Sequence, residues 1–112
     1  MKPKMILERN GDISWRLPNG LLHRDDGPAV ITTNDNKKWY KNGEKHRVGG
    51  PAHIAHKGRF KVWFQNDKLH RVDGPALESP DGFLWCLNGI RYSEAEHKKI
   101  IRNAKIDKLL KD

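Results

Sequence analysis

The 112-residue sequence predicts an all-β fold, in which about four hairpin repeats of 23–25 residues form a single-layer twisted antiparallel meander, with one C-terminal α-helix as a cap. The pattern Trp-x-x-Asn-Gly-x-x-His-Arg-x-x-Gly-Pro-Ala reads from Trp39 to Ala52, and variants precede and follow it. His-Arg and Gly-Pro-Ala recur at steps of 23 and 24 residues, a period typical of stacked arrays of one supersecondary unit. We expect structural roles for the repeated residues Trp15, Trp39, Trp63, Trp85, His23, His46, His70, Gly27, Gly50 and Gly74.

The composition agrees with a thin, extended core in a single repeat domain, residues 1–112. Only 36% of the residues are hydrophobic, which is low for a chain that encloses a compact core. A stacked repeat needs less burial per unit, because each unit shields only its neighbours. Disorder does not explain the composition, since four tryptophans recur in register and disordered chains are poor in aromatic residues.

Turn residues divide the array into its units. A degenerate first unit begins at Pro3, twelve residues before Trp15, just as Pro51 stands twelve residues before Trp63. In this unit, strands at 5–8 and 13–17 are joined through Asn10-Gly11, which favours a type I′ hairpin turn. Each later unit has a strand after Gly-Pro, a polar turn, a strand with the tryptophan and a second turn. The units are about 3–27, 28–50, 51–74 and 75–92, and their second turns begin at Asn19, Asn42, Asn66 and Asn88.

Strand alternation predicts the repeating core contact. Side chains two residues apart share a face of the sheet, so Trp39 and Tyr40 point to opposite faces. The small Ala of each Gly-Pro-Ala is the expected neighbour of an indole ring, with Ile31 and Ile54 two residues on and on the same side. Tryptophan beside alanine is therefore the predicted core.

A capping helix is predicted at residues 93–111. Ser93 and Glu96 form a capping box, which opens a helix from about Glu94 to Lys111. Its residues Ile100, Ile101 and Ala104 make one apolar stripe, whereas Ile106, Leu109 and Leu110 drift around the axis. We therefore expect the last turns to bind elsewhere or to fray.

Positive charge is concentrated in the middle of the chain. The formal net charge is +8, and residues 35–74 carry +6 from ten Lys or Arg and four acidic residues. Such a field attracts acidic protein surfaces, nucleic acid or anionic lipid headgroups. Cys86 is the single cysteine, and no segment approaches the roughly 18 apolar residues of a membrane span. These features predict a soluble, cytoplasmic protein.

The stretch from Trp39 through Asn42-Gly43 to His46 resembles the MORN repeat, whose Trp, Asn-Gly, His-Gly and closing Gly follow nearly the same period. Where that family has His-Gly-x-Gly, this chain has the longer His-Arg-x-x-Gly-Pro-Ala, as in residues 70–76. The variant is similar to MORN-like repeat proteins of phages and giant viruses, in which an ending like residues 85–94 also leads into a helix. Over about residues 3–100, the resemblance implies an all-β repeat sheet, a non-enzymatic binding role and a viral accessory protein in the host cytoplasm.

The three His-Arg pairs invite a metal or catalytic interpretation, which the spacing opposes. Equivalent residues of successive hairpins lie roughly 10 Å apart, whereas zinc requires ligand atoms about 2.0–2.3 Å from one centre. In the fourth unit Tyr92 replaces the histidine, which keeps a planar ring with a polar tip and discards a base. Asp26 and Asp73 precede motif glycines where the middle unit has Gly49, so a turn role is favoured over acid-base catalysis. We expect structural histidines, no metal, no cofactor and no catalytic residue.

The expected binding surface is the basic face of the two central units. The motif arginines would line one side of the array at intervals of roughly 10 Å, close to three nucleotide steps of about 3.4 Å. The aromatic residues Trp39, Trp63, Tyr40 and Phe64 either stack the bases of a single strand or form the repeat core beneath solvated lysines. We expect an acidic protein surface as the partner, with RNA or single-stranded DNA as the alternative and anionic membrane surfaces as a further one. The basic residues are Arg24, Arg47, Arg71, Lys37, Lys41, Lys45, Arg59, Lys61 and Lys68.

Overall fold

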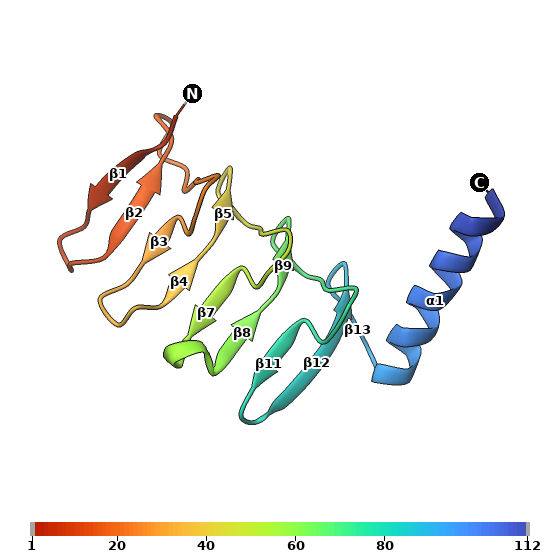
Figure 1. The fold of residues 1–112 in the computed structure, drawn as a ribbon. Coiled ribbons are helices and arrows are strands. Elements are labelled where there is room, and N and C mark those ends of the chain that lie inside the picture. Colours follow the sequence, from red (N-terminus) through yellow and green to blue (C-terminus); the bar gives the residue numbers. More distant parts are fainter. Residues whose placement is uncertain (1, 112) are drawn as a thin grey trace.

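The structure, a computed structural model, describes residues 2–111 and the side chains of residues 2–108. It is dominated by one antiparallel sheet in an elongated molecule of 51 × 36 × 18 Å (Figure 1). Strands that follow one another in this sheet also lie side by side, which confirms the predicted meander. In sheet order the nine strands are β1 (Lys4–Leu7), β2 (Ile13–Arg16), β3 (Val30–Ile31), β4 (Lys37–Lys38), β7 (His53–Ala55), β8 (Phe60–Val62), β11 (Leu77–Ser79), β12 (Gly82–Leu87) and β13 (Ile90–Tyr92).

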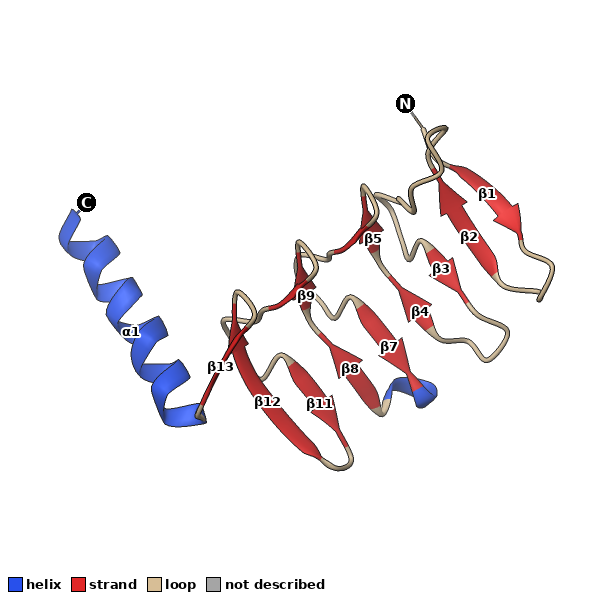
Figure 2. Ribbon diagram, turned by 180° about the vertical axis from the view of Figure 1, so that it is seen from behind, coloured by secondary structure: helices blue, strands red, loops and turns tan. Residues whose placement is uncertain are grey.

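Small hairpins form a second row along one end of the main strands (Figure 2). β5 (Tyr40–Lys41) pairs with β6 (Glu44–Lys45), and β9 (Phe64–Gln65) pairs with β10 (Lys68–Leu69). The chain passes from the main sheet to a small hairpin at a tryptophan. The Trp39 N–H donates to Ala52 O of the main sheet (2.7 Å), whereas Trp39 O accepts from the His46 N–H (3.2 Å). Trp63 makes the same two bonds with Ala76 and His70, so the tryptophans mark the line where the sheet divides.

The buried core is a narrow line of small side chains. Ala29, Ala52 and Ala76 are fully buried, and their backbone oxygens accept the N–H groups of Trp15, Trp39 and Trp63. The four tryptophans themselves are half-buried. Alanine beside tryptophan is thus the repeating core contact, as alternation predicted. The other buried apolar residues in the described range are Ala55, Val62, Cys86 and Leu87.

The second turns have the left-handed backbone of type I′ hairpins in three units. Two successive positive φ angles occur at Asn42-Gly43 (47° and 81°), Asn66-Asp67 (50° and 66°) and Asn88-Gly89 (50° and 82°). The type I′ turn predicted at Asn10-Gly11 is wrong, because only Gly11 has a positive φ there. Asn10 Oδ1 accepts the Asp12 N–H (2.9 Å), and this Asx turn replaces the predicted geometry.

The C-terminal helix α1 (Glu94–Lys111) begins at the predicted capping box. The Ser93 N–H donates to Glu96 Oε1 (2.9 Å), and the Glu96 N–H donates to Ser93 Oγ (3.1 Å). These bonds, the one from the Ser93 backbone first, lower the pKa of Glu96. The helix therefore has a fixed start, where it packs against β12 and β13, and it then extends away from the sheet (Figure 1).

The predicted apolar stripe of the helix is wrong in part. Ile101 is half-buried, whereas Ile100 and Ala104 are exposed, because the helix diverges from the sheet after its first turns. Ile106 is 47% exposed. The side chains of Leu109 and Leu110 lie outside the described residues. Within residues 2–111, no helix combines the length and apolar character needed to cross a bilayer.

Candidate functional site

Each motif arginine stacks on the tryptophan of its own unit. The planar guanidinium lies over the indole ring in a cation–π contact, which is worth about 0.5–2 kcal/mol. Nη1 of each arginine also donates to the backbone carbonyl of the proline that follows four residues later in the sequence, at 3.0–3.1 Å. The arginines are therefore held by the scaffold, and each covers one face of an indole. The pairs are Arg24 on Trp15, Arg47 on Trp39 and Arg71 on Trp63, with Cζ at 3.7, 4.0 and 3.8 Å from the ring centroids.

The packed arginine explains the glycine of Gly-Pro-Ala. A Cβ atom on Gly74 would lie 2.7 Å from Arg71 Cζ, and one on Gly50 would lie 2.8 Å from Arg47 Cζ. Both distances are shorter than the optimal carbon–carbon separation of about 3.5–4.0 Å. A larger residue would therefore displace the guanidinium, so its close approach, rather than a left-handed backbone, favours glycine here.

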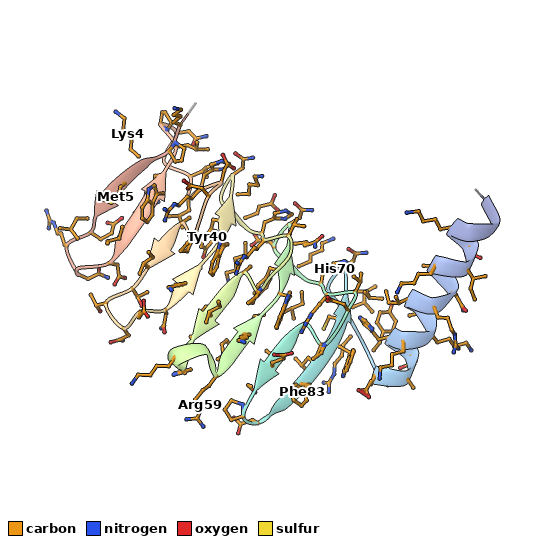
Figure 3. All side chains as sticks on the ribbon, viewed as in Figure 1. Lys4, Met5, Tyr40, Arg59, His70 and Phe83 are labelled. Atoms are coloured by element: carbon orange, nitrogen blue, oxygen red, sulfur yellow. The ribbon has the colours of Figure 1, made fainter. Side chains whose placement is uncertain are left out.

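Each motif histidine binds the turn of the following unit. His23 Nδ1 accepts the Asn42 N–H (2.9 Å), and His70 Nδ1 accepts the Asn88 N–H (3.0 Å), with His70 among the small hairpins in Figure 3. His46 does the same for Asn66 (3.1 Å). The prediction that the rings bond to a turn is confirmed. Among the described residues, no three His, Cys, Asp or Glu side chains are grouped so that they could hold a metal ion.

The helix supplies different partners for the last tryptophan. His97 contacts Trp85 edge to face, with ring centroids 5.1 Å apart, and Lys98 Nζ lies 5.7 Å from the Trp85 ring centroid. His97 is only 1% exposed, and its Nε2 is 2.6 Å from Arg71 O, to which it donates. Sequence reasoning missed His97. The sequence does contain a signal for it, because no His-Arg pair follows Trp85 and another residue must therefore pack on that ring.

Acidic side chains neutralise the first and third arginines. Arg24 Nε donates to Asp26 Oδ1 (3.0 Å), and Arg71 Nε donates to Asp73 Oδ1 (3.0 Å). Arg71 Nη1 also contacts Glu78 Oε1 (2.9 Å). The two aspartates that the sequence assigned to turns are therefore ion-pair partners as well.

The second arginine differs from the other two. The position of the aspartate is occupied by Gly49, and Arg47 forms no ion pair with any of the described residues. Partial burial lowers the pKa of the Arg47 guanidinium, although an arginine remains protonated at neutral pH. The middle unit thus carries a fixed positive charge that the scaffold leaves unbalanced.

The predicted basic residues do not form one continuous face. Lys41 Nζ lies 3.6 Å from Asp25 Oδ1, and Lys45 Nζ lies over the Phe64 ring at 5.0 Å. Arg59 follows the 3₁₀ turn η1 (His56–Gly58), at the outer end of the main hairpins and far from the small hairpins where Tyr40 lies (Figure 3). Lys68 is exposed at the start of β10.

Two of the predicted lysines do share one face with Arg47. Lys37 of β4 and Lys61 of β8 are the two cross-strand partners of Ile54 in β7, so the three side chains lie in one row. The same row continues to Glu78, which contacts Arg71, and this contact places the row on the side of the sheet that carries the arginines. We call this side, with its tryptophans, arginines and the row from Ile31 to Glu78, the arginine face.

Three clefts recur along the arginine face, each between the loop after one motif arginine and the next unit. Their volumes are about 390, 410 and 430 Å³. The middle cleft is lined by Arg47, Gly49, Trp63 and Arg71, and the last by Trp85, His97 and Ile101. The clefts are therefore a product of the repeat, and their charges differ from unit to unit.

Likeness to other proteins adds nothing to this geometry. Comparisons of the chain with protein-family models, with curated proteins and with solved structures give no match. The MORN resemblance stays a prediction from the motif.

Proposed function

We propose that this chain is a non-enzymatic binding module that engages an acidic protein surface through the middle of its arginine face. The observation that carries the proposal is the distribution of charge along that face. Arg24 and Arg71 at either side have carboxylate partners, whereas Arg47 in the middle has none among the described residues and lies on the face that also carries Lys37 and Lys61. Unbalanced cations on a partly desolvated surface attract a partner of opposite charge.

The use of the motif side chains supports a non-enzymatic role. The histidines bind turns through Nδ1, and the arginines are fixed on indole rings. A general base needs a nitrogen within reach of a substrate proton, and here Nδ1 of each motif histidine is already bonded within the scaffold.

Single-stranded nucleic acid is the alternative partner, and the aromatic residues favour it less. Binding without sequence preference uses exposed rings on which successive bases stack. Trp39 and Trp63 each have one face covered by an arginine, and Phe64 lies under Lys45. Tyr40 is half-buried, and this burial, with the nearby charge of Asp67, raises the pKa of its hydroxyl. The lysines would remain as phosphate contacts, but stacking would be weak.

Anionic membrane surfaces are the least favoured partner. Interfacial binding combines basic residues with apolar residues that enter the lipid. The exposed apolar residues Met5, Ile6 and Leu7 gather in β1 at the edge of the sheet, whereas beside Arg47 and Arg71 the exposed apolar side chains are the short Val48 and Val72.

The experiment is retention of partners from cell lysate on the tagged full chain, with and without nuclease, at low and moderate salt. We expect an acidic protein that persists through nuclease and is lost from the Lys37→Gln/Lys61→Gln variant. The matched control is Lys99→Gln/Lys108→Gln, which removes the same charge from exposed positions of α1 and should retain the partner. Heterogeneous material that disappears on nuclease treatment would instead favour nucleic acid.

A further inference from the structure

The surroundings of Arg47 differ from those of Arg71 at two positions, and from those of Arg24 at one of the two. The first is Gly49, which stands where the other units have Asp26 and Asp73. In those units a carboxylate oxygen lies 3.0 Å from the arginine Nε, so this edge of the guanidinium accommodates a carboxylate. A Cβ atom on Gly49 would meet no heavy atom within 4 Å, so the space beside it is open.

The second position is seven residues after the arginine, in the first strand of the next unit. Glu78 has this position relative to Arg71 and contacts its Nη1 at 2.9 Å, whereas the equivalent residue after Arg47 is Ile54. Ile54 is flanked across the sheet by Lys37 and Lys61, which lie roughly 10 Å apart over two ladder steps. Arg71 thus has two carboxylate partners, Asp73 and Glu78, whereas Arg47 has none among the described residues and has Lys37 and Lys61 on either side of Ile54.

The geometry points to a carboxylate-binding site formed by Arg47, Lys37 and Lys61, which receives an Asp or Glu side chain of the acidic partner. This inference deepens the proposed function and rests on it. Arg47 Nη1 is committed to Pro51 O (3.0 Å), so Nε and Nη2 remain for a bidentate carboxylate. The indole of Trp39 and the Pro51 carbonyl hold the guanidinium in place before the partner arrives, which reduces the entropy lost on binding.

The decisive variant supplies the missing carboxylate from within the chain. Ile54→Glu copies the Glu78 arrangement beside Arg47 and leaves the arginine and both lysines unchanged. Ile54→Gln is its uncharged control. Asn103→Glu is the matched charge control, because it adds the same charge at an exposed position of α1, away from Arg47 and both lysines.

The ligand for the test is a synthetic peptide, blocked at both ends, in which Glu alternates with neutral residues, and inorganic phosphate is titrated separately. Dissociation constants are measured at one fixed ionic strength, and the Nε–Hε resonances of the arginines are followed by NMR. We expect the peptide to shift the Arg47 resonance more than those of Arg24 and Arg71. Ile54→Glu should weaken peptide binding by about tenfold, and both controls by less than about twofold.

The outcomes separate the site from the function. Equal weakening by Ile54→Glu and Asn103→Glu would overturn the site, because net charge alone would then explain binding, and would leave the proposed function standing. Failure of the peptide to bind the unmodified chain would overturn both. Phosphate that shifts Arg47 at lower concentration than the peptide would overturn the carboxylate assignment. If Ile54→Glu does not fold, the Arg47 resonance of the unmodified chain still decides, since an unmoved signal at saturating peptide contradicts the site.

Discussion

The motif tryptophans in the interior of the array and the tryptophan at its C-terminal end are contacted by different kinds of side chain. In the interior, the ring of each tryptophan is covered by the arginine of its own unit. The histidine directly before that arginine bonds to the turn of the next unit. At the end, Trp85 is contacted by His97 and Lys98, which come from the helix. The Trp85 ring is therefore also contacted by a basic and an aromatic side chain, but both come from the helix and not from its own unit.

The difference shows what the repeated motif encodes. A motif histidine accepts a hydrogen bond from the Asn turn of the next unit. The fourth unit is followed by the helix and not by such a turn, and it has Tyr92 in place of the histidine. The carbonyl of Arg71 is bonded by His97 Nε2 at the same end. The motif thus specifies hydrogen bonds between neighbouring units. At the last unit, which has no following neighbour in the sheet, the helix supplies the contacts instead.

The largest effect is expected at the end of the array. His97→Ala should lower the free energy of unfolding by about 2–3 kcal/mol, because it removes a fully buried ring and leaves Arg71 O without its donor. Urea unfolding at neutral pH measures the loss. Lys98→Ala is the control on the same turn, and since Lys98 is exposed its cost should stay under about 0.5 kcal/mol. Equal costs for the two variants would mean that the helix does not cap the sheet through His97.

The fold could be predicted from the sequence because its signals are either repeated or local. The period, the Asn-Gly turns and the alanine beside each tryptophan follow from spacing, and the capping box at Ser93 and Glu96 follows from four adjacent residues. The turn at Asn10-Gly11 was mispredicted because an Asx bond to Asp12, which is a side-chain contact, competes with the backbone preference of the Asn-Gly pair.

The site was less predictable, because it depends on contacts between units. The basic residues could be named, but spacing does not show that an arginine turns back onto its own tryptophan, or that Lys41 reaches Asp25. The replacement of Asp by Gly49 was visible in the sequence and suggested only a turn. Its consequence for Arg47 appears once Asp26 and Asp73 are seen bonded to the equivalent arginines.

An intermediate effect is expected in the interior. His46→Ala removes the acceptor of the Asn66 N–H and should cost about 1 kcal/mol, the usual net contribution of one hydrogen bond. Tyr92→Phe removes the polar tip at the equivalent position of the fourth unit and should change stability by less than about 0.5 kcal/mol, since no turn follows. Hydrogen exchange of the Asn66 amide provides a local readout, and it should accelerate in His46→Ala alone. An unchanged Asn66 amide would contradict the role of the histidine.

The smallest effect is a dependence of stability on pH in the middle of the sheet. His53 occupies the position of Val30 and Leu77 in the neighbouring units, in one cross-strand row with Lys38. Burial, and then the charges of Lys38, Lys45 and His56, lower the pKa of His53 below its usual 6.5. The unfolded chain therefore binds a proton first as the pH falls below that value, so the folded state loses stability in this range and loses none above it.

His53→Val, which copies Val30, should remove this loss. His53 is only partly buried, and the charges around it are screened. We therefore expect the loss of unfolding free energy below pH 6.5 to differ between the two proteins by less than about 1 kcal/mol. Urea midpoints of both proteins, measured on either side of pH 6.5, provide the comparison. Above that pH the two curves should run parallel, and below it the midpoint of the unmodified protein should fall faster. Curves that stay parallel throughout would show that His53 keeps its ordinary affinity for protons.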